Sequence, residues 1–503
     1  MEQYVPLVTR DTPSIHPEQH DSVAASDVDF ERPDGLPLPR WYQLPRWNAS
    51  PKWELTTGWN NWSWHGIPDA KTSLWGILSF IGTLLPRYAQ PGGLKVKGEL
   101  HPTAYLDALR GWVAILVMNY HTFGNKATIL EKPLFSAFLN GRAMVDIFFV
   151  ISGYVLSYRL LRMIRNHEPG FQKALASSTF RRWLRLYAST AIASLVTAIA
   201  VYLGWCRPEF RKATFLAQLD HWMWDTVAAT SPFANINGYW SRDVFRTQYL
   251  DQMWTIPVEF RGSLVVFWFC AAAACLSTRG RKIFCCVVMA LCYLWATAYA
   301  GIFLLGVLIA DFSFDRYPER LSRIRLAQQQ NLDTLPEKAC QRQSPFAKAG
   351  YVCLLLVAMF LLGQPPTEFG YANYFLWPTL SKAIPWYYPP ELGQHVWLSV
   401  GSGLLVFTLD RCRMLQIPLE SGFSQYLGDL SFGVYAMHNT VNWCLYMPYV
   451  EPWRAIHLGD GFFSGLPGMV FTTLVILWVA DYFTRIDNWV VWLGKWLESK
   501  TFV

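Results

Sequence analysis

The sequence predicts an all-α membrane protein, a bundle of about ten transmembrane helices that follows a disordered polar N-terminal tail. Three observations support this fold class. Hydrophobic residues make up 52% of the 503 residues, and charged residues only 16%. The chain contains 25 Trp, 24 Tyr and 32 Phe, an enrichment that suits aromatic belts at two membrane interfaces. Apolar runs long enough to cross a bilayer recur after residue 100, with short basic segments between them.

Composition also argues against two other classes of function. The formal net charge of +7 does not indicate nucleic-acid binding, because the basic residues fall in short blocks between apolar runs. The cysteines show no Cys-x-x-Cys spacing, so the sequence supports neither a metal site nor a disulfide framework. Most of them lie in or beside apolar stretches, and we interpret them as small buried hydrophobic residues.

Residues 1–100 are predicted to form a cytosolic N-terminal tail. Its first part, to about residue 70, is rich in Pro, Asp and Ser and lacks the basic start and hydrophobic stretch of a signal peptide. The stretch "SLWGILSFIGTLL" (73–85) is too short to span a bilayer and is a candidate interfacial helix. The glycosylation-like triplets at Asn48 and Asn61 are interpreted as chance matches in a cytosolic segment.

The membrane domain is predicted over residues 101–485, and a cytosolic C-terminal tail over 486–503. The candidate spans are roughly 104–123, 143–161, 186–205, 252–276, 283–299, 300–314, 348–364, 393–410, 425–447 and 463–484. The fifth and sixth are short and meet near Gly301, so they form either a helical hairpin or one long bent helix.

The basic loops predict the orientation in the membrane. A cytoplasmic N-terminus places "STRGRK" (277–282) and "DRCRM" (410–414), together with the other basic loops, on the cytoplasmic side. The loops assigned outside, around 206–250, 365–392 and 448–462, are rich in Trp, Tyr and Pro. An integral protein of this kind is expected in the endoplasmic reticulum or another endomembrane.

Ionisable residues stand on one face of the first predicted span. Arg110 and His121 are eleven residues apart, which brings them within ~20° of the same helical face with ~16 Å of rise between them. Asp107 lies about one turn before Arg110. Taken singly, Arg110 could reach the head groups while paired with Asp107, and His121 could be an interfacial histidine. Together they form a polar stripe, and ionisable residues inside a membrane helix are functional candidates.

Five segments carry a resemblance to a known family. They are "LDALRGWVAILVMNYH" (106–121), "DIFFVISGYVLS" (146–157), "RRWLRLY" (181–187), "MWTIPVEFRGSLVVF" (253–267) and "LGDLSFGVYAMHNTV" (427–441). In this order, and over residues 104 to about 485, the chain resembles the acyltransferase 3 family of integral membrane O-acyltransferases. The "FRG" that follows Glu259 resembles the fungal branch rather than the bacterial one.

The resemblance implies a chemistry. It implies transfer of an acyl group from acyl-CoA, with acetyl-CoA as the expected donor, to a hydroxyl of a small molecule such as a fungal secondary metabolite. Acyl-CoA would be a co-substrate rather than a tightly bound cofactor. His121 would act as general base, and Arg110 would bind a donor phosphate or stabilise the developing oxyanion. The lipid-embedded bundle would exclude water as a competing acceptor.

Two further polar residues have a structural and a functional interpretation. Glu259 would line the substrate pocket or orient His121, or else pair structurally with the nearby Arg261. Ser152 could act as a nucleophile or bind substrate, although no Gly-x-Ser-x-Gly elbow surrounds it. The neighbouring Gly153 favours close helix packing at this point instead.

A compact basic patch is predicted on the cytoplasmic side. Arg181, Arg182 and Arg185 could bind the CoA phosphates, since arginine forms forked contacts with phosphate. The alternative is that they only orient the neighbouring helices. Arg159 and Arg162 are candidates to extend this patch.

Other features leave alternatives open. His438 could line the same cavity, or be a packing histidine bonded to a neighbouring hydroxyl. "HWMWD" (221–225) matches the His-x-x-x-Asp of soluble acyltransferases but is interpreted as a coincidence. A proton-coupled transporter, with Arg110, His121 and Glu259 as a relay, is the alternative function, although the sequence shows no internal repeat.

Overall fold

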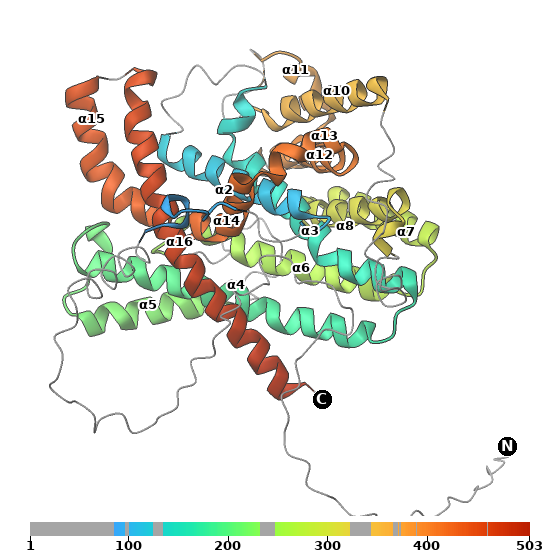
Figure 1. The fold of residues 1–503 in the computed structure, drawn as a ribbon, viewed down its shortest axis with the longest axis horizontal. Coiled ribbons are helices and arrows are strands. Elements are labelled where there is room, and N and C mark those ends of the chain that lie inside the picture. The colour runs from blue at the N-terminus through green and yellow to red at the C-terminus, as the bar shows by residue number, and fades with distance from the viewer. Residues whose placement is uncertain are drawn as a thin grey trace, which may run out of the picture. The chain divides into compact units, whose positions relative to one another are not determined.

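The structure, a computed structural model, describes residues 85–95, 100–123, 134–231, 247–321, 344–365, 371, 374–388, 390–459 and 461–502. Every regular element within these residues is a helix, which confirms the predicted all-α class (Figure 1). The triplets at Asn48 and Asn61 and nearly all of the interfacial helix predicted at 73–85 lie outside the described residues.

The long helices are α2 (Ala104–Phe123), α3 (Gly141–Asn166), α4 (Phe171–Tyr202), α5 (Phe215–Ala229), α6 (Thr255–Ala272), α7 (Thr278–Leu294), α8 (Ala298–Arg316), α10 (Pro345–Leu362), α12 (Pro390–Arg411), α14 (Gly422–Val441) and α16 (Phe462–Thr501). The shorter ones are η2 (Arg87–Ala89), η4 (Ser136–Leu139), η5 (Pro208–Phe210), η6 (Asp251–Trp254), α11 (Trp377–Leu380), η8 (Ser381–Ala383), α13 (Arg413–Gln416), η9 (Ile417–Glu420), the π-helix η10 (Asn442–Val450) and α15 (Glu451–Leu458).

Local sequence signals explain where several helices begin and end. In five of the helices that the structure describes, a side chain at the N-cap accepts a hydrogen bond from a backbone N–H of the first turn, which satisfies one of the unpaired donors there. These caps are Asn140, Thr214, Ser277, Ser344 and Ser421. Between α3 and α4, residues 167–170 form a tight turn in which His167 and Gly170 have positive φ values of 51° and 83°.

Seven helical stretches among the described residues are long and apolar enough to cross a membrane. They are Gly141–Asn166, Phe171–Tyr202, Asp251–Ala272, Ala298–Arg316, Pro345–Leu362, Leu392–Arg411 and Phe463–Thr501. The other three predicted spans coincide with α2, α7 and α14, which are helical but shorter or more polar. The integral membrane character is therefore supported, whereas the count of about ten spans is not confirmed.

The fifth and sixth predicted spans are two separate helices. α7 ends at Leu294, and Ala296 takes a left-handed φ of 54°. The N–H of Thr297 then donates back to the carbonyl of Cys292 at 2.8 Å, which closes the last turn. α8 folds back against α7. The hairpin interpretation is therefore correct, and the alternative of one bent helix is wrong.

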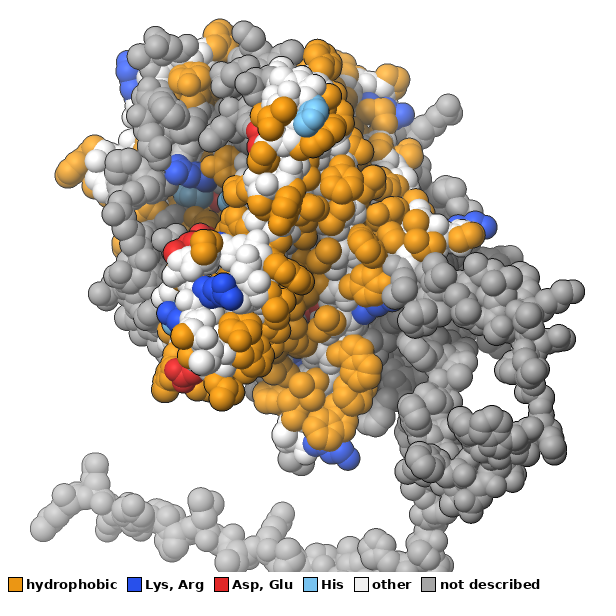
Figure 2. Space-filling view, turned by 90° about the vertical axis from the view of Figure 1, so that its left-hand side faces the viewer, with side chains coloured by type: hydrophobic (Ala, Val, Ile, Leu, Met, Phe, Trp, Pro, Cys, Tyr) orange, Lys and Arg blue, Asp and Glu red, His pale blue; other side chains and the backbone are white. Residues whose placement is uncertain are grey.

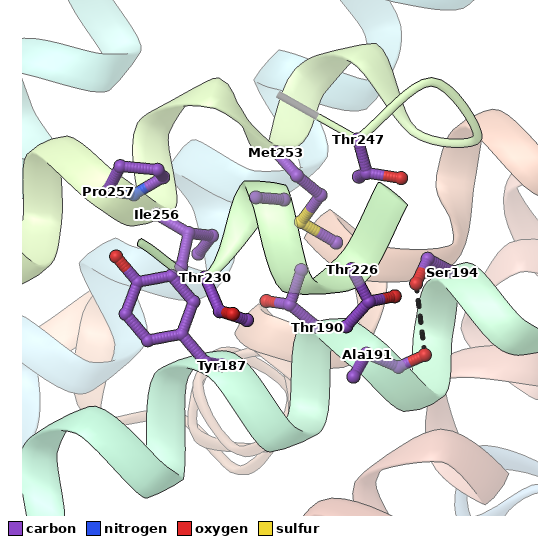
Figure 3. Close-up of a pocket in the computed structure, with 11 residues that line it drawn as sticks. Tyr187, Thr190, Ala191, Ser194, Thr226, Thr230, Thr247, Met253, Ile256 and Pro257 are labelled. Atoms are coloured by element: carbon purple, nitrogen blue, oxygen red, sulfur yellow. Dashed lines mark hydrogen bonds between the residues drawn. The ribbon is translucent and has the colours of Figure 1, made fainter. Parts of the chain in front are cut away.

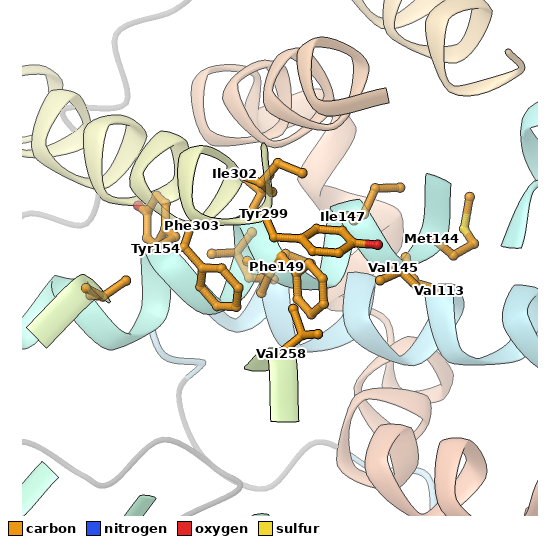
Figure 4. Close-up of a cluster of buried hydrophobic side chains, with 14 of the residues drawn as sticks. Val113, Met144, Val145, Ile147, Phe149, Tyr154, Val258, Tyr299, Ile302 and Phe303 are labelled. Atoms are coloured by element: carbon orange, nitrogen blue, oxygen red, sulfur yellow. The ribbon is translucent and has the colours of Figure 1, made fainter. Parts of the chain in front are cut away.

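The main hydrophobic core surrounds α3. Figure 4 shows its buried side chains converging with those of α2, α6 and α8. Two glycines allow α3 and α8 to touch closely: a Cβ at Gly153 would lie 2.0 Å from the carbonyl oxygen of Phe303, and one at Gly306 would lie 2.1 Å from that of Val150. Small residues at helix crossings are typical of membrane bundles. The predicted packing role of Gly153 is confirmed.

α16 is longer than the predicted span at its position. It continues as one helix to Thr501, so the predicted boundary at residue 485 falls inside it. Its second half lies against α4, where Glu498 pairs with Arg181 at 2.9 Å and Ser189 donates to Asp487 at 2.5 Å. The segment after residue 485 is thus an attached helix.

Apolar side chains also cover part of the outside of the bundle. α10 and α16 are the least buried of the seven candidate spans, and both expose large hydrophobic residues, such as Phe471 and Trp478 on α16. Figure 2 shows apolar side chains over much of one face, with few charges among them. Such a surface suits contact with lipid.

Candidate active site

The site is built where α2 and α14 cross. Asp107 stands in the first turn of α2, where a negative charge favours helix formation. A Cβ at Gly111 would lie 2.3 Å from the carbonyl carbon of Leu427, and one at Gly428 would lie 2.6 Å from the carbonyl oxygen of Asp107. The missing side chains therefore let the two backbones touch, and this contact places the polar residues of α2 against α14.

Arg110 points toward polar groups rather than lipid. Its Nη2 donates to Ser431 Oγ at 3.2 Å, and its Nη1 lies 3.7 Å from Asp107 Oδ1, so the predicted pair with Asp107 is present. Electrostatic interactions also link Arg110 to Arg185 and to Glu259. The arginine is thus part of a charged region between α2, α4, α6 and α14.

His121 meets a second histidine at the other end of the crossing. Its ring centroid lies 5.3 Å from that of His438, and the two planes are tilted by 32°. His121 is exposed, whereas His438 is fully buried. His438 Nδ1 lies 3.1 Å from the carbonyl oxygen of Val434, which can only accept, so Nδ1 carries the proton. Nε2 of His438 is then the nitrogen with a free lone pair.

Several buried polar atoms near these ends of α2 and α14 have no hydrogen-bond partner among the described residues. His438 Nε2 is buried and has no hydrogen-bond partner among the described residues. The same holds for Asn442 Oδ1, one turn after His438, and for Asn119 Oδ1 and Thr122 Oγ1, which neighbour His121 in sequence but lie on other faces of α2. Buried polar groups are almost always paired, so the unpaired atoms of His438 and Asn442, one helical turn apart, make this end of α14 a candidate contact for a polar ligand.

A hydrogen-bond network holds His438 in place. Tyr435, one turn before His438, donates its hydroxyl to the carbonyl of Gln252 and lies 2.5 Å from Thr255 Oγ1. Asn439 donates to Gln252 Oε1 at 2.7 Å. These bonds tie α14 to η6 and the start of α6, so the segment that resembles the family's Trp-Thr/Ser-x-x-Val-Glu sequence supports the histidine.

Ser152, Arg182 and Glu259 come together from three helices. Ser152 donates to Glu259 Oε1 at 2.5 Å, and Arg182 forms an ion pair with the same oxygen. Arg182 also donates from Nε to Ser263 Oγ at 2.8 Å. The expected neighbour Arg261 is therefore not the partner in this ion pair. Ser152 is bonded to a carboxylate and an arginine rather than to a histidine that could activate it as a nucleophile.

The three arginines of the predicted patch divide between two places. Arg182 and Arg185 face the site, since Arg182 pairs with Glu259 and Arg185 interacts electrostatically with Asp107 and Arg110. Arg181 turns the other way and pairs with Glu498 of α16. The predicted patch is therefore not a single unit. Arg182 and Arg185 remain candidates for substrate binding, whereas Arg181 attaches α16 to α4.

The "HWMWD" segment does not form a catalytic pair. His221 Nδ1 bonds to the hydroxyl of Tyr249 at 2.7 Å, while Asp225 accepts from Thr247 at 2.5 Å. Burial and the nearby Lys212 lower the pKa of His221 below its usual range. The two side chains stabilise the segment after α5, which agrees with a coincidental match.

Two buried polar clusters were not predicted from the sequence. Asp146 and His395 are almost fully buried and lie 2.8 Å apart, with Tyr299 OH 3.3 Å from the other ring nitrogen of His395. Asp410 accepts hydrogen bonds from Tyr105 and Tyr154, among others, and pairs with an arginine. The available signal was an aspartate inside an apolar span, which needs a buried partner.

A family model described as an acyltransferase domain, acyltransferase 3, matches residues 103–485. No solved structure matches the chain.

Three curated fungal proteins are similar over most of their length. The chain is 28% identical to O-acetyltransferase PaAT-1 of Phomopsis amygdali over 470 residues, which cover 84% of this chain and 89% of the relative. It is 23% identical to acyltransferase R4 of a Phoma species, covering 72% and 84%. It is 22% identical to acyltransferase clz18 of Cochliobolus lunatus, covering 67% and 82%.

Proposed function

The chain belongs to the acyltransferase 3 family, and on that premise we propose that it transfers an acetyl group from acetyl-CoA to a hydroxyl of a small fungal metabolite. The observation that carries this proposal is the contact between His121 and His438 at one end of a polar stripe that has Arg110 at its other end. Family membership supports acyl transfer itself. The identities of the acyl donor and of the acceptor are our proposal.

The charges suggest how the donor lies. Arg110, Arg182 and Arg185 form a region that is basic on balance, and guanidinium groups suit the phosphates of CoA. On the charge-based orientation this region is nearer the cytoplasmic end of α2, where CoA is available. The acyl end of the donor would then extend along α2 toward His121.

The distance between Arg110 and His121 favours one of the two roles considered for Arg110. An oxyanion donor must lie within hydrogen-bond reach of the reacting carbonyl. About 16 Å of helix rise separates Arg110 from His121, which is too far for one small reacting group to touch both. The pantetheine arm of CoA bridges such a separation between thioester and phosphates. This separation supports the proposal that Arg110 binds the donor phosphates.

The histidine pair would manage the proton. His121 accepts the proton of the acceptor hydroxyl while the hydroxyl oxygen attacks the thioester carbon, so a C–O bond forms and the C–S bond breaks. The proton then passes from His121 to the departing sulfur, which leaves as the thiol of CoA. His438 Nε2, which has no partner among the described residues, can accept a hydrogen bond from the protonated His121 or from the acceptor.

The same residues were candidates for a proton relay in a transporter. Family membership favours acyl transfer over that alternative. Glu259 is also held by an ion pair with Arg182 and a hydrogen bond from Ser152. A carboxylate held in this way is poorly suited to pass protons along a transport path.

The test compares metabolite extracts of host cells that express wild type or His121→Ala at matched membrane-protein levels, by mass spectrometry. His457→Ala is the matched control, because His457 is an exposed histidine on α15. We expect a product heavier by one acetyl group in wild type and in the control, and its absence in His121→Ala. Equal amounts of product in all three strains would remove His121 as the base.

A further inference from the structure

Two cysteines that the active site does not use meet beyond the ends of α4 and α14. Cys206 lies in the turn between α4 and η5, and Cys444 lies in the π-helix η10. A hydrogen bond joins their two thiols. Both cysteines are reduced in the structure, with Cys206 buried and Cys444 half-buried. They are far apart in the chain, so no sequence spacing indicates the pair.

Contacts of the neighbouring residues hold the two thiols together. The guanidinium carbon of Arg207 lies 4.4 Å from the ring centroid of Trp443, so the residues next to the two cysteines also touch. One turn before Cys444, Thr440 Oγ1 lies 2.8 Å from Thr197 Oγ1 of α4. The approach of the thiols therefore follows from how the two segments pack, and not from one side-chain rotamer.

The second half of α4 is a firm anchor for such a pair. Figure 3 shows Thr190 and Ser194 of α4 with Thr226 and Thr230 of α5 around a hollow that has room for about one water molecule. Trp222 of α5 donates to Ser194 Oγ at 3.0 Å. α5 thus packs against this half of α4 and leaves no space for a substrate between them.

η10 is held less firmly than α4. Of its nine residues, Asn442 and Tyr446 are buried, whereas Met447 and Tyr449 are more than half exposed. η10 directly continues α14, the helix that carries His438. A covalent link at Cys444 would therefore fasten an exposed segment that follows an active-site histidine.

The charge-based orientation places both thiols on the side away from the cytosol. Cys206 begins a loop assigned to that side, and η10 leads into another. Disulfides form and persist in oxidising compartments such as the lumen of the endoplasmic reticulum, and they are rare in the cytosol. By contrast, Cys275 and Cys412 lie beside or within basic loops assigned to the cytoplasm.

The thiol pair suits a disulfide better than a metal ion. Among the described residues, no group of three or more His, Cys, Asp or Glu side chains is placed to hold a metal. Structural zinc needs four such ligands. An S–S bond requires the two sulfur atoms to come within about 2 Å. The turn that carries Cys206 lies outside any helix, so its backbone can follow this movement.

We propose that Cys206 and Cys444 form a redox modification site, at which a disulfide ties η10 to the end of α4. The oxidant is a small disulfide of the oxidised-glutathione class. Cys444, the more exposed thiol, attacks it as the thiolate, so a mixed disulfide forms and one glutathione leaves as its thiol. Cys206 then attacks Cys444 Sγ, which forms the protein disulfide and releases the second glutathione thiol. The two protons of the cysteine thiols end on the two glutathione thiols.

The first experiment uses the purified full chain in detergent, incubated with either reduced or oxidised glutathione. Free thiols are then blocked with N-ethylmaleimide, and proteolytic peptides are analysed by mass spectrometry without reduction. We expect a peptide that links Cys206 to Cys444 in most molecules after oxidised glutathione, and its absence after reduced glutathione. Absence of this peptide under both conditions would overturn the proposal, and so would links spread equally over other cysteines.

The thermal unfolding temperature tests whether the disulfide fastens η10. We expect oxidation to raise it by about 3 °C in wild type. Cys444→Ser and, as a second variant, Cys206→Ser should each remove this rise. Cys275→Ser is the matched control, because Cys275 is an exposed cysteine elsewhere in the bundle, and it should keep the rise. An unchanged unfolding temperature in oxidised wild type, or a rise that persists in both serine variants, would contradict the link.

A third measurement examines the protein in its own membrane. Thiols are blocked as the cells are broken, and the same linked peptide is sought in the membrane fraction. The linked peptide is the expected result, and free thiols at both cysteines would overturn oxidation in the cell. None of these readouts depends on acyl transfer, so the redox site and the proposed function stand or fall separately.

Discussion

The imidazole of His121 lies 5.3 Å, between ring centroids, from that of His438, although the two residues are 317 positions apart in the chain. One ring is exposed and the other is fully buried, and the buried ring keeps a free Nε2. This relationship depends on the close crossing of α2 and α14 at Gly111 and Gly428. It is the basis for two of the predictions below, those for His438 and Gly428.

If the pair works as one unit, His438 matters as much as His121. We expect His438→Gln to lower kcat by about 100-fold or more, the usual scale for removing a proton-transfer group. The double variant with His121→Ala should be no worse than the worse single variant, because residues that act together are not additive. Initial rates of acetyl transfer measure this, and multiplied losses would show that the histidines act independently.

Glu259 and Arg182 form a largely buried ion pair. Glu259→Gln leaves the arginine without its carboxylate, and we expect a loss of about 3 kcal/mol in stability. Replacing both residues, as Arg182→Met with Glu259→Leu, should recover most of this stability. Unfolding in detergent measures the stability. Recovery of stability without activity would assign the pair a role in the site, whereas recovery of both would make it structural.

The contact at Gly428 should tolerate no side chain. We expect Gly428→Ala to destabilise the protein by about 1–3 kcal/mol, because the added Cβ meets backbone of α2 that cannot yield easily. It should also lower activity by displacing the histidine pair. Gly350→Ala is the control, since a Cβ there meets nothing within 4 Å. Unchanged stability and activity in Gly428→Ala would contradict the close crossing.

Arg185 and Arg181 should behave differently although they are one turn apart. We expect Arg185→Ala to raise the KM for acetyl-CoA by about 10-fold, since one charge-assisted contact to phosphate is lost. Arg181→Ala should leave that KM unchanged, because Arg181 pairs with Glu498 instead. Steady-state kinetics over a range of acetyl-CoA concentrations separates the two. Equal increases of this KM in both variants would instead indicate that Arg181 and Arg185 bind CoA together.

His221 lies outside the candidate membrane spans, and it should make the stability of the protein depend on pH. Burial and Lys212 lower its pKa below 6.5, so the unfolded chain binds more protons here than the folded chain. The stability from this group is present above pH 6.5 and is lost as the pH falls toward the folded pKa. We expect unfolding temperatures at pH 7.5 and 5.5 to differ more for wild type than for His221→Gln. An equal difference would assign this acid sensitivity to other groups.

Much of the fold follows from local patterns. Each predicted span coincides with a helix, because apolar length and helix caps act within one segment. The resemblance carried by five segments agrees with the family match over residues 103–485. The hairpin at α7 and α8 could not be separated from a bent helix, since a single left-handed residue, Ala296, decides it.

The sequence by itself determined that Arg110 and His121 share a helical face, because the α-helix repeats every ~3.6 residues. Only the tertiary structure decided which side chains from other helices meet them. It placed His438 against His121, gave Glu259 the partner Arg182 instead of Arg261, and turned Arg181 toward α16. The physical reason is that periodicity is a property of one helix, whereas such pairs depend on how closely two helices approach. That approach is set by glycines and packing contacts hundreds of residues apart.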